Sequence, residues 1–126
     1  MKFLICGIGS IGQRHYKNLI SLGHQIALFR IGGGANAPFI EKFLSEEKSA
    51  GRPVKTYYNF QGAIDDFRPD AVFITNPNSR HLETALFAAK SGCNLFIEKP
   101  LSHTRDGLEE LKTLADEKKL KIMIGY

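Results

Sequence analysis

A glycine-rich turn near the start of the chain constrains the fold more than any other feature. Residues 7–12 read Gly-Ile-Gly-Ser-Ile-Gly, and we call them the glycine turn. They follow the apolar run 3–6 and lead into an amphipathic segment at residues 11–22. A strand, a tight turn and a helix in this order begin a βαβ unit, in which the helix connects two parallel strands. We therefore expect a parallel sheet that contains the first strand.

The rest of the chain repeats this alternation of strand and helix. Strand-like runs lie at residues 3–6, 25–29, 54–57, 71–75, 94–97 and 120–124, and helical patterns lie at residues 11–22, 39–48, 60–67, 80–90 and 105–118. Most of the runs are continuously apolar, which is typical of strands buried on both faces of a parallel sheet. We expect Thr104 to cap the last helix. The predicted fold class is α/β, a Rossmann-type doubly wound parallel sheet of about six strands with helices on both faces.

Composition limits what this fold can do. The chain has 126 residues, which is enough for one domain, and 43% hydrophobic with 24% charged residues is the balance of a globular protein. No apolar run approaches the roughly 20 residues of a membrane helix, so no membrane contact is expected. The net charge of +4 is not gathered into a basic stripe, so nucleic acid is not an expected partner either.

The two cysteines indicate a compartment rather than a reaction. Cys6 and Cys93 lie in or beside different apolar runs and lack the spacing of metal ligands. We expect both to be buried as small hydrophobic residues, with no metal bound. Free thiols of this kind fit a reducing, cytoplasmic environment.

The glycine turn predicts a dinucleotide site. A G-x-G-x-x-G pattern that follows a strand and opens a helix has the context of the dinucleotide-binding fingerprint. Gly7 would allow the turn, Gly9 would let the backbone approach a pyrophosphate, and Gly12 would let helix and strand pack closely. Ser10 and Ile11, at the start of the helix, would offer backbone N–H groups to the phosphates. The alternative is a glycine-rich turn that binds nothing.

The end of the second expected strand predicts which dinucleotide binds. A carboxylate at this place binds the ribose 2′-hydroxyl of NAD, whereas an arginine accommodates the 2′-phosphate of NADP. No Asp or Glu lies between Gly23 and Gly34, and Arg30 stands at the expected position. Arg30, followed by a glycine-rich loop at residues 31–36, therefore favours NADP, with NAD as the alternative. Arg30 as an ordinary solvated residue is the interpretation without a function.

Two polar motifs follow later strands and make the prediction more specific. They are Thr75-Asn76-Pro77 with His81, and Glu98-Lys99-Pro100. Ligands of an open parallel sheet bind outside the carboxyl ends of its strands, where these motifs should meet the glycine turn. Together, the three motifs resemble the nucleotide-binding half of the Gfo/Idh/MocA (glucose–fructose oxidoreductase / inositol dehydrogenase) family, and the resemblance covers essentially all 126 residues.

The resemblance implies roles for these motifs. Members of the family transfer a hydride between a nicotinamide and a carbon of a sugar, a sugar derivative or a cyclitol. Lys99 is then the expected catalytic residue, because an ammonium beside the reacting oxygen stabilises alkoxide character, and burial would tune it for proton transfer. Glu98 would place the nicotinamide ribose or Lys99, and Pro100 would hold the turn extended or in a cis bond. Thr75, Asn76, Pro77 and His81 would line the cofactor.

The resemblance also implies a second domain that residues 1–126 do not include. Members of the family continue into an α/β domain that supplies most substrate contacts and through which the full-length protein is expected to form homo-oligomers. We therefore expect residues 1–126 to be one NAD(P)-binding Rossmann domain that turns over no sugar-like substrate by itself. The alternative is a stand-alone dinucleotide-binding module. Arg14 and His15 match the family pattern, but we assign them no chemistry.

Overall fold

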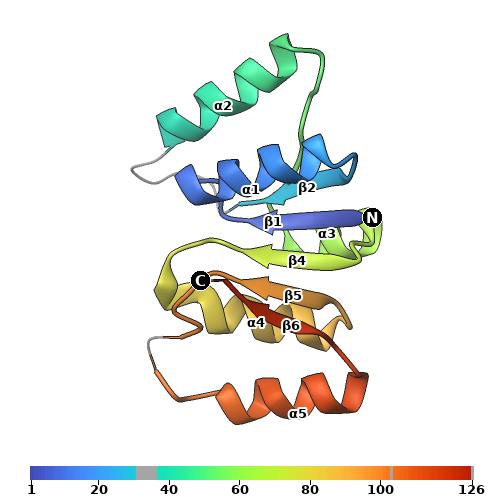
Figure 1. Ribbon diagram of the computed structural model, residues 1–126, viewed down its shortest axis with the longest axis vertical. Coiled ribbons are helices and arrows are strands. Elements are labelled where there is room, and N and C mark those ends of the chain that lie inside the picture. Colours follow the sequence, from blue (N-terminus) through green and yellow to red (C-terminus); the bar gives the residue numbers. More distant parts are fainter. Residues whose placement is uncertain (31–36, 103, 126) are drawn as a thin grey trace.

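Strands and helices alternate along the chain, as the sequence predicts (Figure 1). The computed structural model describes residues 1–30, 37–102 and 104–125. Its strands are β1 (Lys2–Cys6), β2 (Gln25–Phe29), β3 (Lys55–Tyr57), β4 (Ala71–Ile74), β5 (Asn94–Ile97) and β6 (Ile122–Ile124). Its helices are α1 (Ser10–Ser21), α2 (Ala37–Ser49), α3 (Phe60–Phe67), α4 (His81–Lys90) and α5 (Leu108–Lys118), with a short 3-10 turn at Asn78–Arg80 before α4.

All strand pairs of the sheet are parallel. Within the described part of the chain the sheet has six strands, in the order β3-β2-β1-β4-β5-β6. The strand order reverses between β1 and β4, and in doubly wound folds such a reversal marks the crevice where ligands bind. The prediction of a Rossmann-type doubly wound sheet is confirmed. The loop predicted at residues 31–36 lies outside the described residues.

Each face of the sheet has its own hydrophobic core. Successive side chains of a strand point to opposite faces, so Leu4 and Cys6 of β1 join one core while Phe3 and Ile5 join the other. The first core is completed by side chains from α3, α4 and α5, and the second by side chains from α1 and α2. Helices therefore cover both faces, as the continuously apolar strands predict.

The last helix begins later than the sequence predicts, and Thr104 does not cap it. Gly107, with a φ of 88°, immediately precedes α5. A Cβ at Gly107 would lie 3.1 Å from Cδ2 of Leu82 on α4. The close approach to α4 and the left-handed backbone at Gly107 therefore set the start of α5. Neither is visible in the pattern of apolar residues that suggested an earlier start.

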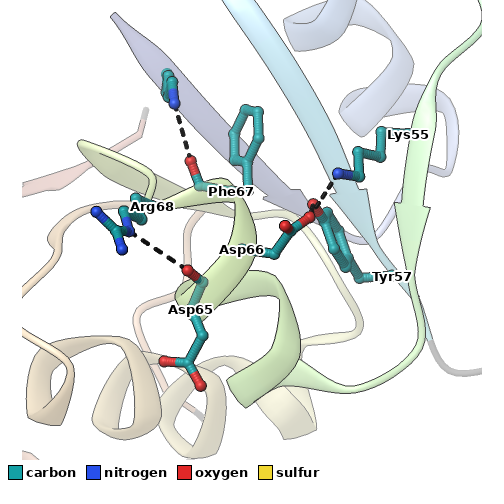
Figure 2. Close-up of polar contacts among 7 residues, drawn as sticks. Lys55, Tyr57, Asp65, Asp66, Phe67 and Arg68 are labelled. Carbon is teal, nitrogen blue, oxygen red and sulfur yellow. Dashed lines mark hydrogen bonds and ion pairs between the residues drawn. The ribbon is translucent and has the colours of Figure 1, made fainter.

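Polar contacts fasten α3 to the edge strand β3 (Figure 2). The Asp66 carboxylate of α3 accepts hydrogen bonds from Lys55 Nζ and Tyr57 Oη, both on β3. The hydrogen bond from Lys55 holds the pKa of Asp66 below its usual value. Arg68, in the left-handed conformation with a φ of 53°, ends the helix, and its Nε donates to the carbonyl oxygen of Asp65. These contacts fix the edge of the sheet.

Both cysteines are buried, as predicted. Cys6 lies on β1 and is 1% exposed, and Cys93 directly precedes β5 and is 5% exposed. Burial raises the pKa of both thiols, so neither has the thiolate character of a nucleophile. Among residues 1–30, 37–102 and 104–125, no three His, Cys, Asp or Glu side chains gather as metal ligands would. None of the helices described there has the length and apolar character to cross a bilayer.

Candidate functional site

The glycine turn presses directly against the loop that follows β4. Gly7 has a φ of 97°, a conformation that L residues rarely adopt. A Cβ at Gly7 would lie 2.5 Å from the backbone nitrogen of Asn76 and 2.8 Å from the carbonyl carbon of Thr75. Position 7 therefore requires glycine for two independent reasons, its backbone angle and its contact with the β4 loop.

Gly12 brings α1 close to the same turn. A Cβ at Gly12 would collide with the carbonyl oxygen of Gly7 and would lie 3.0 Å from Thr75 Oγ1. That hydroxyl donates to the Gly7 carbonyl oxygen at 2.5 Å and lies 3.2 Å from that of Cys6. The close helix packing expected at Gly12 is therefore present, and Thr75 ties the glycine turn to the end of β4.

The start of α1 is open and carries no negative side chain. Gly9 is the N-cap residue, it makes no side-chain hydrogen bond to the helix, and the first turn has no acidic residue. A Cβ at Gly9 would meet no atom of the described residues within 4 Å. Ser10 and Ile11 follow, both exposed. The unpaired N–H groups and positive dipole end of α1 thus lie beside space that none of the described residues fills, an arrangement that suits a phosphate.

The loops after β1, β4 and β5 lie side by side because the sheet ladder continues past the strand ends. Thr75 N donates to the carbonyl oxygen of Cys6 at 2.9 Å, and Glu98 N donates to that of Ile74 at 3.0 Å. Gly125 N donates in the same way to Ile97 O at 2.8 Å, beyond β6. Three segments are therefore adjacent at the carboxyl ends of the strands: the glycine turn, the Thr75-Asn76-Pro77 loop and the Glu98-Lys99-Pro100 turn.

Asn76 and His81 lock the two later loops together. Asn76 Nδ2 donates to Thr84 Oγ1 at 2.9 Å, while its buried Oδ1 has no hydrogen-bond partner among the described residues. His81 is the first residue of α4 and is only 1% exposed. Its Nε2 lies 2.7 Å from the carbonyl oxygen of Asn76, and its Nδ1 lies 2.9 Å from that of Pro100. His81 is therefore a buried link between the loops, whereas Pro77 lies exposed beside them.

The turn after β5 presents Lys99 to solvent. The Lys99-Pro100 peptide bond is cis, one of the two forms expected for this turn. The Lys99 side chain is exposed, so the burial expected to tune it is absent from this chain. The neighbouring Glu98 is directed elsewhere: its Oε1 lies 2.6 Å from Nε2 of His15 on α1. Glu98 and Lys99 therefore differ in their surroundings although they are adjacent in sequence.

His15 lies at the site through its contact with Glu98, although no role was predicted for it. Its side chain is 17% exposed and packs edge-on against the rings of Phe73 and Phe96, with centroids 5.4 and 5.1 Å away. The available signal was its spacing: His15 lies three residues after Gly12, so both are on the helix face that meets the sheet. Its partner Glu98 is 83 residues away, which local patterns do not reveal.

Arg30 lies beside the glycine turn but is not a free surface cation. It follows β2, where Phe29 O accepts from Gly7 N at 3.4 Å, and its own backbone nitrogen donates to Tyr57 O. The side chain is 6% exposed, and its Nη1 donates to Glu41 Oε1 at 2.7 Å. A carboxylate from α2 therefore already engages this guanidinium, and the cofactor-binding role of Arg30 stays a prediction.

Comparison with known proteins agrees with this geometry. A model of the oxidoreductase family with an NAD-binding Rossmann fold, GFO_IDH_MocA, matches residues 1–126. The chain belongs to the Gfo/Idh/MocA family. The match is to the NAD-binding Rossmann fold of that family, and the recognition made from the three sequence motifs is confirmed.

This Gfo/Idh/MocA domain is similar to a named dehydrogenase and to a catabolism protein. It is 30% identical over 117 residues to scyllo-inositol 2-dehydrogenase (NAD(+)) of Bacillus subtilis (strain 168), covering 91% of this chain and 31% of the relative. It is 27% identical over 122 residues to the rhizopine catabolism protein MocA of Rhizobium meliloti, covering 97% and 36%. The chain thus spans about a third of the length of these relatives.

Solved structures share the fold. The myo-inositol 2-dehydrogenase from Lactobacillus plantarum superposes with a TM-score of 0.76 and 26% identity, over 99% of this chain and 36% of that one. The UDP-N-acetylglucosamine 3-dehydrogenase GnnA from Acidithiobacillus ferrooxidans has a TM-score of 0.78 at 24% identity, over 99% and 38%, a likeness of fold alone. The fold of this Gfo/Idh/MocA domain is therefore also found in solved structures of dehydrogenases.

Proposed function

We propose that this domain binds a nicotinamide dinucleotide and forms the cofactor half of an oxidoreductase. The enzyme would transfer a hydride between the nicotinamide and a hydroxyl-bearing carbon of a sugar, a sugar derivative or a cyclitol. The observation that carries the proposal is the open start of α1, where Gly9 leaves free space beside unpaired N–H groups. The dehydrogenase names of its relatives support the substrate class.

The pyrophosphate would lie against the start of α1. The backbone N–H groups of Ser10 and Ile11 would donate to it, and Gly9 has no side chain in the way. The exposed Ile11 side chain adds apolar surface to the same place. Gly7 and Gly12 would act indirectly, because their close contacts hold the turn and helix in position.

The nicotinamide end would lie beside the loop after β4. The buried Asn76 Oδ1 has no partner among the described residues, and a buried acceptor without a donor is unfavourable unless a ligand or water supplies one. A hydroxyl or amide of the cofactor would supply that donor. Thr75 and Pro77 would form the wall on either side of Asn76, held in place by His81.

Lys99 would act on the substrate. When bound, the nicotinamide supplies or accepts the hydride. The Lys99 ammonium, exposed at the end of β5, would donate a hydrogen bond to the reacting oxygen of the substrate and stabilise its negative charge. Glu98, held by His15, would fix the backbone from which Lys99 extends. Further substrate contacts, and assembly into a homo-oligomer, would come from the rest of the full-length protein.

The geometry favours NAD over NADP as the cofactor. The preference for NADP predicted from Arg30 is not supported, because Glu41 pairs with this guanidinium and the Bacillus subtilis relative is named as an NAD(+) enzyme. The general assignment to an NAD(P)-binding family stands. We propose NAD, with NADP as the second candidate.

Titration with NADH tests this function through Gly9. The Gly9→Ala variant should unfold at the same denaturant concentration as the wild type, because its Cβ enters free space. It should bind NADH at least about tenfold more weakly, since one displaced charge-assisted hydrogen bond costs about 1.5–3 kcal/mol.

Gly62→Ala on α3 is the matched control, because its Cβ would make only ordinary contacts with Asn59. It should leave NADH affinity unchanged. A wild-type chain that binds neither NADH nor NADPH would overturn the proposed function. Equal NADH affinities of Gly9→Ala and wild type would remove the pyrophosphate from the start of α1.

A further inference from the structure

We infer that Glu41 sets the dinucleotide preference of this domain, in place of the carboxylate that is missing from the end of β2. This inference rests on the proposed function. The residue that follows β2 is Arg30, which by itself would favour a 2′-phosphate. The tertiary structure adds a carboxylate to that position from near the start of α2, eleven residues further along the chain.

The Arg30–Glu41 pair lies where the adenosine ribose of a dinucleotide is read. Phe29, the last residue of β2, accepts a hydrogen bond from Gly7 of the glycine turn, and Arg30 is the next residue. A dinucleotide with its pyrophosphate at the start of α1 places its ribose hydroxyls at the end of this neighbouring strand. Any charged group held there faces the 2′ position.

The two members of the pair differ in exposure. The Arg30 side chain is 6% exposed, whereas that of Glu41 is 64% exposed. Their contact of 2.7 Å between Nη1 and Oε1 is a charge-assisted hydrogen bond. The positive group is thus buried beneath a negative group that reaches solvent. An approaching ribose therefore meets the carboxylate of Glu41 before the guanidinium of Arg30.

This arrangement discriminates between the two cofactors. Within the described chain, only Oε1 of Glu41 has a hydrogen-bond partner, so Oε2 can accept from a ribose 2′-hydroxyl, as a carboxylate does in NAD-binding folds. A 2′-phosphate carries a charge of about −1.5 to −2 and is repelled by the same carboxylate. Glu41 also neutralises Arg30, the cation that a phosphate would need. Both effects favour NAD.

Removal of the carboxylate should reverse the effect, because Arg30 retains unused donors. Its Nε is buried and has no hydrogen-bond partner among residues 1–30, 37–102 and 104–125. Without Glu41, both this group and Nη1 would gain from an added acceptor with negative charge. The Arg30 side chain is then expected to bind the 2′-phosphate, the role that the sequence suggested for it.

Parallel titrations with NADH and NADPH test the inference. Wild type should bind NADH more tightly than NADPH. Glu41→Gln, which keeps the shape and removes the charge, should move the affinity ratio toward NADPH by about tenfold or more, since one charge-assisted hydrogen bond corresponds to about that factor. The gain should shrink in high salt, which screens charges of this exposure. Glu41→Ala should act in the same direction.

Glu46→Gln is the matched control. Glu46 lies on the same helix, is 63% exposed and pairs with Lys42 rather than with Arg30. Its loss of charge should leave the ratio unchanged. The inference would be overturned if the wild type preferred NADPH, or if the Glu41 variants kept the wild-type affinity ratio. In either case the proposed function would still stand, provided that the wild type binds NADH. A wild-type chain that binds neither dinucleotide would overturn both.

Discussion

His15 on α1 and Glu98 after β5 form a hydrogen-bonded pair, with 2.6 Å between Nε2 and Oε1, although 83 residues separate them. Both side chains are 17% exposed, so neither is fully hydrated. The pair joins the helix that begins at the glycine turn to the turn that carries Lys99. The part of the candidate site expected to bind the phosphates is therefore connected to the part expected to bind the substrate.

A double-mutant cycle measures this connection. His15→Ala and Glu98→Ala should each lower the free energy of unfolding by about 1–3 kcal/mol, because each leaves a half-buried polar partner unsatisfied. The double variant should cost less than the sum of the two, with a coupling energy of about 0.5–3 kcal/mol in urea unfolding. Strictly additive losses would show that the two side chains do not stabilise one another.

Replacement of His81 should loosen the Lys99 turn. His81→Phe keeps a ring of similar size but loses the contacts with the carbonyl oxygens of Asn76 and Pro100. We expect a loss of about 2–3 kcal/mol in the free energy of unfolding, from the buried groups left without partners, and faster hydrogen exchange at residues 98–101. Arg80→Ala, at the exposed neighbouring position, is the control and should change neither. Unchanged exchange in the His81 variant would contradict its linking role.

Lys99→Met should affect the chemical step in the complete protein. Loss of one hydrogen-bond donor to a developing oxyanion typically lowers kcat by about a hundredfold to a thousandfold. NADH affinity should change little, because the exposed ammonium is proposed to contact substrate. Steady-state kinetics and NADH titration separate the two quantities, and Lys112→Met, exposed on α5, is the control. An unaltered kcat would remove Lys99 from the reaction.

The stability of the α1–α2 contact should depend on pH. Arg52 donates to both carboxylate oxygens of Glu47, at 2.9 and 3.1 Å, and Tyr16 Oη donates to Oε2 at 2.9 Å. The hydrogen bond from Arg52 holds the pKa of Glu47 below its ordinary 4.5. The stabilisation is therefore complete above pH 4.5 and is lost as pH falls through the lowered value. In denaturant titrations, the free energy of unfolding of Glu47→Gln should depend less on pH in this acid range than that of the wild type.

Tyr16 should make the free energy of unfolding decrease at alkaline pH, whereas Glu47 makes it decrease at acid pH. Burial, together with its hydrogen bond to Glu47, raises the pKa of Tyr16 from 10.0 to about 12. Its contribution is complete below pH 10 and disappears as pH rises toward the folded-state value. Tyr16→Phe should lose about 0.5–1.5 kcal/mol near neutral pH, the net worth of one hydrogen bond, and should show no such alkaline loss. An alkaline limb retained in Tyr16→Phe would assign it to another group.

Some features of the site could be predicted from the sequence and others could not. The positive φ of Gly7 and the contact of Gly12 with the Gly7 carbonyl oxygen both lie within the glycine turn, so the pattern of glycines predicted the turn and the helix contact. The exposure of Lys99 depends on what covers it, and the start of α5 depends on its packing against α4 through Gly107. Neither the exposure of Lys99 nor the start of α5 can be predicted from a short sequence segment.

The Rossmann sheet, the glycine turn and the family could be predicted from the amino-acid sequence, because the periodicity of apolar residues and the conformational freedom of glycine act over a few residues at a time. Which charged side chains pair with one another depends on the folded arrangement of strands and helices. This arrangement placed Glu41 on Arg30 and Glu98 on His15, since parallel strand register and helix packing bring together side chains far apart in the chain. An arginine whose position suggested NADP is thus half of an ion pair, on which the proposed preference for NAD rests.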